Sequence, residues 1–326
     1  MTRLALSLAL LLATTAPAFA QDAPACDAQD RFAIIVHGGT SSGEVRQERL
    51  DFITAMLTQR RAELASGASA LDTVEAAIVA MEDSGLFNAG KAAITNRDGY
   101  VETDASIMDG RSLDAGAVAS QRAIKNPIRA ARLVMENTRH VMMVGDRGEA
   151  AVTALGAETV TPEDYFTRAK AKAATQAPKE HGTVGAAVLD RCGDLAAGTS
   201  TGGYDSKIPG RVGDSPIIGA GVYAANGIMA GSATGHGEFF IRHTAIRSAA
   251  ARMEYGGMTL SEAVSASIDA MDAAGTGRDG RDGRGGIVAV DAQGNVAMPH
   301  TTVGMIHGTT SDRVAPMASQ TGDYRR

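Results

Sequence analysis

A weakly patterned polar segment near the middle of the chain divides this sequence into two parts. Residues 163–182 lack the hydrophobic periodicity of a helix or a strand, and 169–177 contain only alanine, lysine, threonine and glutamine. This composition is typical of an exposed linker, because such a segment has no apolar face to bury. We therefore predict a first segment, 21–182, whose last part, 163–182, is an exposed linker, and a second segment, 183–326.

Both parts contain short apolar runs, separated by glycine turns, together with helical runs. Helices are expected after Ser69 and Thr259, because Asp72 and Glu262 complete capping-box patterns. Predicted strands are 32–36, 92–95, 101–108, 115–120, 141–144, 184–189, 195–201, 216–222, 228–233, 287–290 and 296–298; predicted helices are 45–65, 70–81, one beginning at Pro127, 238–253 and 261–271. Groups of strands alternating with groups of helices favour a layered sandwich of sheets and helices over βαβ units.

Composition excludes several classes of protein. With 44% hydrophobic residues and a net charge of −6 over 326 residues, the chain can bury a large core and is not globally disordered. The negative charge and the 4% aromatic content also disfavour nucleic acid as a partner.

The first twenty residues have the pattern of a secretory signal peptide. Arg3 precedes the apolar run 4–13, and Ala18-Phe19-Ala20 fits the small-x-small cleavage pattern. We predict cleavage after Ala20 and a periplasmic or secreted protein. No later segment is apolar enough to span a membrane, so no membrane partner is expected. Cys26 and Cys192 could pair in that compartment, but two cysteines alone leave the pairing open.

Three familiar motifs are matched only superficially. Residues 198–202 fit the Gly-x-Ser-x-Gly pattern, but the residues that follow cannot begin the helix that a nucleophile elbow requires. Residues 219–224 resemble a dinucleotide loop that likewise lacks its helix. The seven histidines contain no His-Glu-x-x-His spacing, which disfavours a histidine metal site.

Thr183 lies between Gly182 and Val184, where the polar linker becomes an apolar strand. If the bond before Thr183 were cut, the new α-amine, with a reference pKa of about 7.7–8, could take the proton of the threonine hydroxyl. Nucleophile and base would then belong to one residue. The alternative is that Thr183 only begins a strand.

Two further segments carry polar groups suited to a small substrate. Arg211 and Asp214 are three residues apart in a glycine-flanked loop, and together match the α-carboxylate and α-ammonium of an amino acid; a surface salt bridge is the alternative. Thr234 and Gly235, at a strand-to-helix turn, offer a hydroxyl and a backbone N–H for an oxyanion.

These residues resemble the plant-type L-asparaginase/isoaspartyl peptidase family of N-terminal nucleophile (Ntn) hydrolases. The segments that carry the resemblance follow the family order: His37-Gly38-Gly39, Leu86-Phe87-Asn88-Ala89-Gly90, Met108-Asp109-Gly110, Asn126-Pro127, Gly182-Thr183-Val184-Gly185, Thr199-Ser200-Thr201-Gly202-Gly203, 210–216, 234–238 and Gly304-Met305.

The resemblance implies an α+β fold, a four-layer αββα sandwich, which cuts itself between Gly182 and Thr183. The α subunit, 21–182, and the β subunit, 183–326, would assemble as a homodimer of processed units. Thr183 would be the nucleophile, supported by Thr201 with Asn88 nearby. Thr234 and the Gly235 N–H would stabilise the oxyanion, while Arg211, Asp214 and Gly237 bind substrate. No organic cofactor is implied. A structural sodium ion would be bound mainly by backbone carbonyls in a loop that includes Met81, Glu82, Ser84, Phe87, Ala89 and Lys91.

We therefore expect a hydrolase that releases L-aspartate from isoaspartyl dipeptides and ammonia from L-asparagine. A glycosylasparaginase-type enzyme is an alternative, although that branch has asparagine where this chain has Gly203. A non-catalytic exported amino-acid binding protein is another. The sequence does not rank the two substrates, and it assigns no role to the glycine-rich loop between Gly277 and Arg284.

Overall fold

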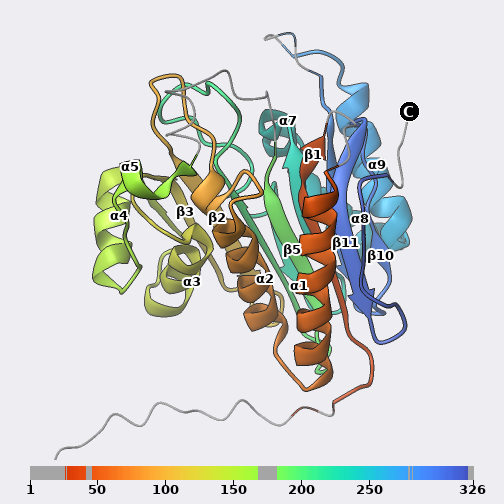
Figure 1. Ribbon diagram of the computed structural model, residues 1–326. Coiled ribbons are helices and arrows are strands. Elements are labelled where there is room, and N and C mark those ends of the chain that lie inside the picture. The colour runs from red at the N-terminus through yellow and green to blue at the C-terminus, as the bar shows by residue number, and fades with distance from the viewer. Residues whose placement is uncertain are drawn as a thin grey trace, which may run out of the picture.

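The described part of the chain contains two β-sheets and the helices that pack on them (Figure 1). The computed structural model describes residues 26, 28–41, 46–167, 182–277, 280 and 282–321. The predicted signal peptide and linker residues 168–181 lie outside these ranges. Within them, no helix is long and apolar enough to cross a membrane.

The larger sheet has eight strands in the described chain, in the order β12-β11-β1-β5-β6-β2-β3-β4, and all neighbours are antiparallel except β3 and β4. Its strands are β1 (Ala33–Ser41), β2 (Thr103–Asp109), β3 (Ala115–Gln121), β4 (Met142–Val144), β5 (Val184–Leu189), β6 (Leu195–Thr201), β11 (Gly304–Ser311) and β12 (Met317–Ser319). The smaller sheet has the order β10-β9-β8-β7, with β7 (Val222–Ala225), β8 (Met229–Gly235), β9 (Gly285–Asp291) and β10 (Val296–Ala297).

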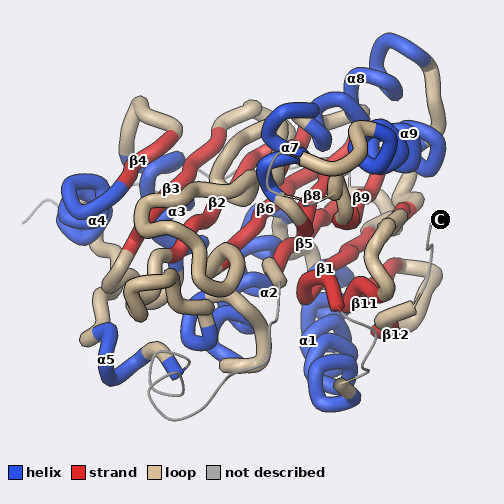
Figure 2. Tube along the Cα trace, turned by 90° about the horizontal axis from the view of Figure 1, so that it is seen from above, coloured by secondary structure: helices blue, strands red, loops and turns tan. Residues whose placement is uncertain are grey.

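Helices cover one face of each sheet, and the other faces pack together. Helices α1 (Gln47–Ala65), α2 (Ala70–Ser84) and α3 (Pro127–Asn137) contact the larger sheet, while α8 (Ala245–Gly256) and α9 (Leu260–Ala273) contact the smaller one. Figure 2 shows α1 and α2 on one side of the strands and α8 and α9 on the other. A separate apolar cluster, which includes Ile35, Leu195 and Val288, joins the two sheets. The other helices in the described residues are η1 (Gly90–Ala92), α4 (Gly145–Ala154), α5 (Pro162–Tyr165) and α7 (Gly237–His243).

Several predicted elements are confirmed because their local signals agree with their packing. Ser69 accepts a hydrogen bond from the Asp72 N–H at the start of α2, and Gly85 ends that helix with φ of +72°. The capping box of Thr259 and Glu262 begins α9. The hairpin predicted after 287–290 is formed by β9 and β10.

Other predictions of secondary structure were wrong. The strand predicted at 92–95 is a 3₁₀ turn followed by a single bridge at Thr95, and 216–221 forms turns before β7. The helix predicted at 238–253 is broken at Thr244, whose φ is +43°. The first strand continues past Val36 through a bulge between His37 and Gly39. At Gly219 and Thr244 a left-handed backbone conformation interrupts the run, and the apolar pattern alone does not show this.

The first residues of the linker predicted at 163–182 are packed against the rest of the structure. Residues 162–165 form α5, and Phe166 is buried beside Ala93 and Val101. The apolar ring of Phe166 explains why the packed part of the first segment extends to this residue.

Cys26 and Cys192 form a disulfide, which the sequence had left open. Their Cα atoms are 5.5 Å apart, although 166 positions separate them in the sequence. Cys192 lies in the turn between β5 and β6, so the bond attaches the segment that precedes β1 to the centre of the larger sheet.

A buried acid links α2 to the larger sheet and gives a testable pH dependence. Oε1 of Glu82 accepts hydrogen bonds from Ser200 Oγ at 2.6 Å and from the Ile128 N–H at 3.1 Å. Burial raises the pKa of Glu82 from 4.5 to about 8. The folded chain therefore holds a proton that the unfolded chain lacks between these values, and this group contributes stability that is lost as the pH rises through that window.

We expect Glu82→Gln to remove this contribution to the pH dependence of stability, because an amide keeps the acceptor but does not ionise. The melting temperature of the native chain should fall more between pH 5 and pH 8 than that of the variant. Thermal denaturation at both pH values tests this, with exposed Glu136→Gln as the control. Equal decreases in the native chain and Glu82→Gln would contradict it.

Candidate active site

Thr183 and Thr201 face each other because β5 and β6 are antiparallel neighbours. Val184 pairs with Ser200, which places the preceding residue, Thr183, opposite Thr201. The hydroxyl of Thr183 donates to Thr201 Oγ1 at 3.0 Å, and Thr183 is only 8% exposed. The predicted nucleophile and its supporting threonine are thus adjacent at one end of the sheet.

The carbonyl of Gly182 is held by two side chains. It accepts a hydrogen bond from Asn88 Nδ2 at 2.6 Å and another from Thr201 Oγ1 at 3.2 Å. Asn88 Oδ1 accepts from the Ile94 N–H at 2.8 Å, which fixes the orientation of the amide. Two donors on one carbonyl oxygen are the arrangement that stabilises negative charge on that oxygen during attack at its carbon.

Close approach of β1 to the Gly182–Thr183 bond requires glycine at position 39. Gly39 has φ of +100°, and a Cβ there would lie 2.5 Å from Gly182 Cα and 3.0 Å from Thr183 N. A larger residue would therefore displace the segment that carries the predicted scissile bond.

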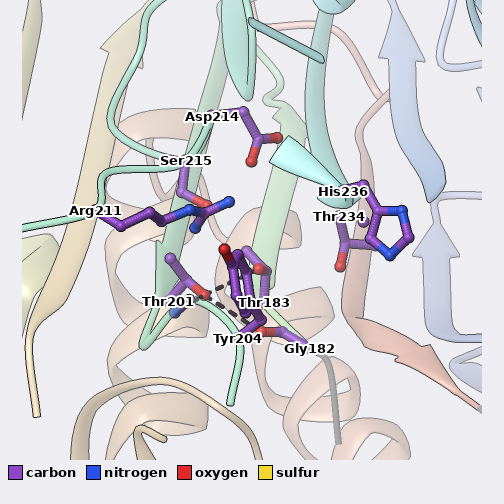
Figure 3. Close-up of a pocket in the computed structure, with 11 residues that line it drawn as sticks. Gly182, Thr183, Thr201, Tyr204, Arg211, Asp214, Ser215, Thr234 and His236 are labelled. Atoms are coloured by element: carbon purple, nitrogen blue, oxygen red, sulfur yellow. Dashed lines mark hydrogen bonds between the residues drawn. The ribbon is translucent and has the colours of Figure 1, made fainter. Parts of the chain in front are cut away.

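Arg211 and Asp214 line the same pocket as Thr183. The other lining residues are Gly182, Thr201, Gly203, Tyr204, Ser215, Thr234, Gly235 and His236. Figure 3 shows Arg211 and Asp214 reaching toward the space beside the Thr183 hydroxyl. Gly237 lies behind them, because a Cβ there would be 2.6 Å from Asp214 Oδ1. The predicted substrate-binding residues are therefore brought together.

Asp214 is nearly excluded from solvent, at 5% exposed, and its Oδ2 has no hydrogen-bond partner in the described structure. Burial raises its pKa to about 7, although Arg211 acts in the opposite direction. The ionisation of this carboxyl is therefore expected to change near neutral pH.

Binding of a free α-amino acid should consequently depend on pH. The ammonium of L-aspartate is attracted by ionised Asp214 and not by the protonated acid, so affinity should fall as the pH drops below about 7. The fall should approach tenfold per pH unit, with little change between pH 8 and 9. Isothermal titration with L-aspartate from pH 5 to 9 measures this. Asp214→Asn should bind weakly at every pH, and a constant dissociation constant for the native chain would contradict the prediction.

Thr234 and Gly235 end β8 and line the pocket. Figure 3 shows Thr234 across the pocket from Arg211. The Thr234 hydroxyl oxygen is buried without a hydrogen-bond partner in the described structure. Gly235 has φ of +143°, and a Cβ there would lie 2.5 Å from Gly285 Cα. This wall of the pocket therefore presents the Thr234 hydroxyl next to the main chain of Gly235, a position where a side chain would not fit.

His37 contacts the predicted nucleophile, Thr183; the sequence placed His37 in a family segment but assigned it no role. Its Nδ1 lies 3.0 Å from the Thr183 carbonyl oxygen, which can only accept, so Nδ1 carries a proton. Burial lowers the pKa of His37 to about 3, so the ring is neutral and Nε2 accepts from Ser232 Oγ at 2.9 Å. Ser232 in turn lies 2.7 Å from Thr199 Oγ1. This chain of hydrogen bonds holds the main chain of Thr183 against the smaller sheet.

The predicted sodium loop connects α2 to η1. Met81 O accepts from Ser84 Oγ at 2.8 Å, Phe87 O from the Ala89 N–H at 2.8 Å, and Lys91 O from Thr167 Oγ1 at 3.2 Å. Each carbonyl oxygen has two lone pairs, so one such bond leaves it able to bind a cation. Glu82 contributes only its main chain to this loop, because its side chain points to Ser200.

The glycine-rich loop between Gly277 and Arg284 contacts the rim of the pocket. The ring Nδ1 of His236 lies 2.6 Å from Asp282 O, and Arg284 Nε is 2.6 Å from an Asp282 carboxylate oxygen. The sequence had assigned no role to this loop, and its residues 278, 279 and 281 lie outside the described ranges.

Comparison with known proteins identifies the family. A family model described as asparaginase matches residues 30–318. This chain belongs to the asparaginase family. Among relatives of this asparaginase-family chain, the isoaspartyl peptidase of Escherichia coli is 42% identical over 300 residues, covering 83% of this chain and 90% of that protein. The isoaspartyl peptidase/L-asparaginase of Homo sapiens is 40% identical over 253 residues, covering 73% of this chain and 82% of that protein. The resemblance inferred from the sequence is confirmed.

Proposed function

We propose that this asparaginase-family chain is a self-cleaving hydrolase that acts on isoaspartyl dipeptides and L-asparagine through an N-terminal Thr183. The observation that carries the proposal is the 3.0 Å contact between the Thr183 and Thr201 hydroxyls, beside a Gly182 carbonyl that accepts two hydrogen bonds. The names of the relatives supply the two substrates.

Self-cleavage begins with attack of Thr183 Oγ1 on the carbonyl carbon of Gly182. A C–O bond forms, the C–N bond to Thr183 breaks, and the nitrogen takes up a proton, so that the amide becomes an ester. Asn88 Nδ2 and Thr201 Oγ1 stabilise the oxyanion on Gly182 during this step. Water then hydrolyses the ester, which leaves a carboxylate on Gly182 and restores the Thr183 hydroxyl beside a free α-amine.

The mature site uses the same hydroxyl on a substrate. Arg211 binds the α-carboxylate and Asp214 the α-ammonium, which directs the side-chain carbonyl toward Thr183. The α-amine accepts the hydroxyl proton, and Thr234 with the Gly235 N–H stabilises the oxyanion. Ammonia leaves from L-asparagine, or an amino acid from an isoaspartyl dipeptide, and water hydrolyses the aspartyl ester to L-aspartate.

The same proposal includes the architecture and assembly of the processed enzyme. The two sheets with their covering helices form the four-layer αββα sandwich of Ntn hydrolases, cut into segments 21–182 and 183–326, and two processed units associate. The main-chain carbonyls of Met81, Glu82, Ser84, Phe87, Ala89 and Lys91 would hold a structural sodium ion, which would stabilise the loop that contains Asn88. The protein is exported after loss of residues 1–20, and the Cys26–Cys192 disulfide suits an oxidising compartment.

N-terminal sequencing of the purified protein under denaturing and reducing conditions tests the proposal. Two fragments are expected, one beginning at Gln21 and one at Thr183, and the protein should release leucine from β-Asp-Leu and ammonia from L-asparagine. A single uncut chain after prolonged incubation, inactive on both substrates, would contradict it.

A further inference from the structure

Tyr204 lies in the pocket but belongs to none of the sequence segments that identify the family. It follows Gly203 and lines the pocket together with Gly182, Thr183 and Thr201. The face of its ring lies against Arg211, with the guanidinium carbon 4.6 Å from the ring centroid. This distance is within the range of a cation–π contact.

The other sides of the Arg211 guanidinium are also restrained. Its Nε donates to Glu238 Oε1 at 3.0 Å. A Cβ at Gly213 would lie 2.6 Å from one terminal nitrogen of Arg211, and a Cβ at Gly237 would lie 3.1 Å from the other. The main chain of these two glycines therefore lies close to both terminal nitrogens. Among the described contacts, the ring of Tyr204 is the side-chain surface that covers the flat face of this group.

Binding of a carboxylate by arginine depends on how the guanidinium plane is oriented. Two parallel N–H···O bonds form only when the carboxylate lies in the plane of the guanidinium. A ring against the face fixes that plane and leaves the N–H edge available. Without the ring, Arg211 would remain tethered at Nε to Glu238, which is itself 43% exposed, and the plane could rotate about this contact.

We propose that Tyr204 is a positioning residue that orients Arg211 for the α-carboxylate of the substrate. The inference deepens the proposed function and rests on it. The carboxylate is bound equally in the ground state and the transition state, so loss of the ring should raise KM and leave kcat nearly unchanged.

The test compares Tyr204→Leu with Tyr204→Phe on two substrates: β-Asp-Leu, and the same dipeptide with its aspartyl α-carboxylate converted to an amide. For Tyr204→Leu we expect KM for β-Asp-Leu to rise about 3- to 30-fold, a range that corresponds to a partly buried cation–π contact. Tyr204→Phe keeps the ring face and should stay within about threefold of the native KM. The amide substrate lacks the group that Arg211 binds, so kcat/KM for it should be the same in the native enzyme and in Tyr204→Leu.

Leucine release and the amount of fragment beginning at Thr183 are measured for every variant. Tyr255→Leu is the matched control, because Tyr255 also contacts an arginine, Arg247, but is 76% exposed and lies outside the pocket lining. If Tyr204→Leu is not processed, Tyr204→Met provides a second variant without the ring.

The outcomes separate this inference from the proposed function. A native chain that is neither cut nor active would contradict the proposed function itself. With an active native enzyme, the role of Tyr204 is overturned by an unchanged KM in Tyr204→Leu, by equal losses on both substrates, or by a phenylalanine variant as impaired as the leucine variant.

Discussion

Thr183→Ala should leave the chain uncut and without measurable hydrolysis of β-Asp-Leu. The substitution removes the hydroxyl that lies 3.0 Å from Thr201 Oγ1 and that belongs to the residue directly after the proposed cut. Loss of a catalytic nucleophile costs about 10⁴-fold or more in rate. Reducing denaturing electrophoresis and a leucine-release assay measure the two effects.

Thr183→Ser is the informative companion, because serine keeps a hydroxyl at the same position. It should still be cut and should retain activity, whereas Thr153→Ala on the surface of α4 should behave like the native chain. Appearance of a fragment beginning at residue 183 in Thr183→Ala would show that the cut does not need this hydroxyl.

The second large effect is expected from Asn88→Asp, which should slow self-cleavage about 10²- to 10³-fold. Asparagine donates from Nδ2 to the carbonyls of Gly182 and Gly203, each at 2.6 Å. An ionised aspartate has no N–H to donate and would place negative charge against the oxyanion, yet it keeps the oxygen that accepts from Ile94. The substitution therefore removes the donor without changing the shape of the side chain.

The fraction of uncut chain as a function of time, measured after rapid purification, gives the rate for Asn88→Asp. Asn137→Asp at the exposed end of α3 is the control for an added charge. A rate within about threefold of the native value would mean that the hydrogen bond to Gly182 does not assist the cut.

Local sequence patterns indicated part of the pocket, namely Thr183, Arg211, Asp214, Thr234 and Gly235, whereas Thr201, Asn88 and Gly237 were implied only by the resemblance to the family. The apolar run that follows Thr183 and the run that ends at Thr201 predicted β5 and β6, and the antiparallel pairing of these strands brings the two hydroxyls together. Arg211 and Asp214 were recognisable because opposite charges occur in a short loop between glycines. Each of these signals lies within a few residues of the side chain concerned.

The contacts that the sequence missed are made between distant segments. His37 reaches Thr183 across 146 positions and Ser232 across 195, and no local pattern encodes either distance. Tyr204 also gave no signal, because the orientation of its ring toward Arg211 depends on the path of the loop. The run 216–222 looked like a strand, but Gly219, with φ of +89°, turns the chain before β7 begins.

The disulfide described above has a particular meaning for a chain that cuts its own backbone. Cys26 precedes the proposed cut and Cys192 follows it, so the two segments would remain one covalent molecule after the peptide bond is lost. Unfolding and refolding would then stay unimolecular. Because the two fragments could not separate, dilution of the oxidised protein would not lower its melting temperature through their dissociation. Reduction would make folding of the cut chain bimolecular, because only non-covalent packing would then hold segment 183–326 against segment 21–182.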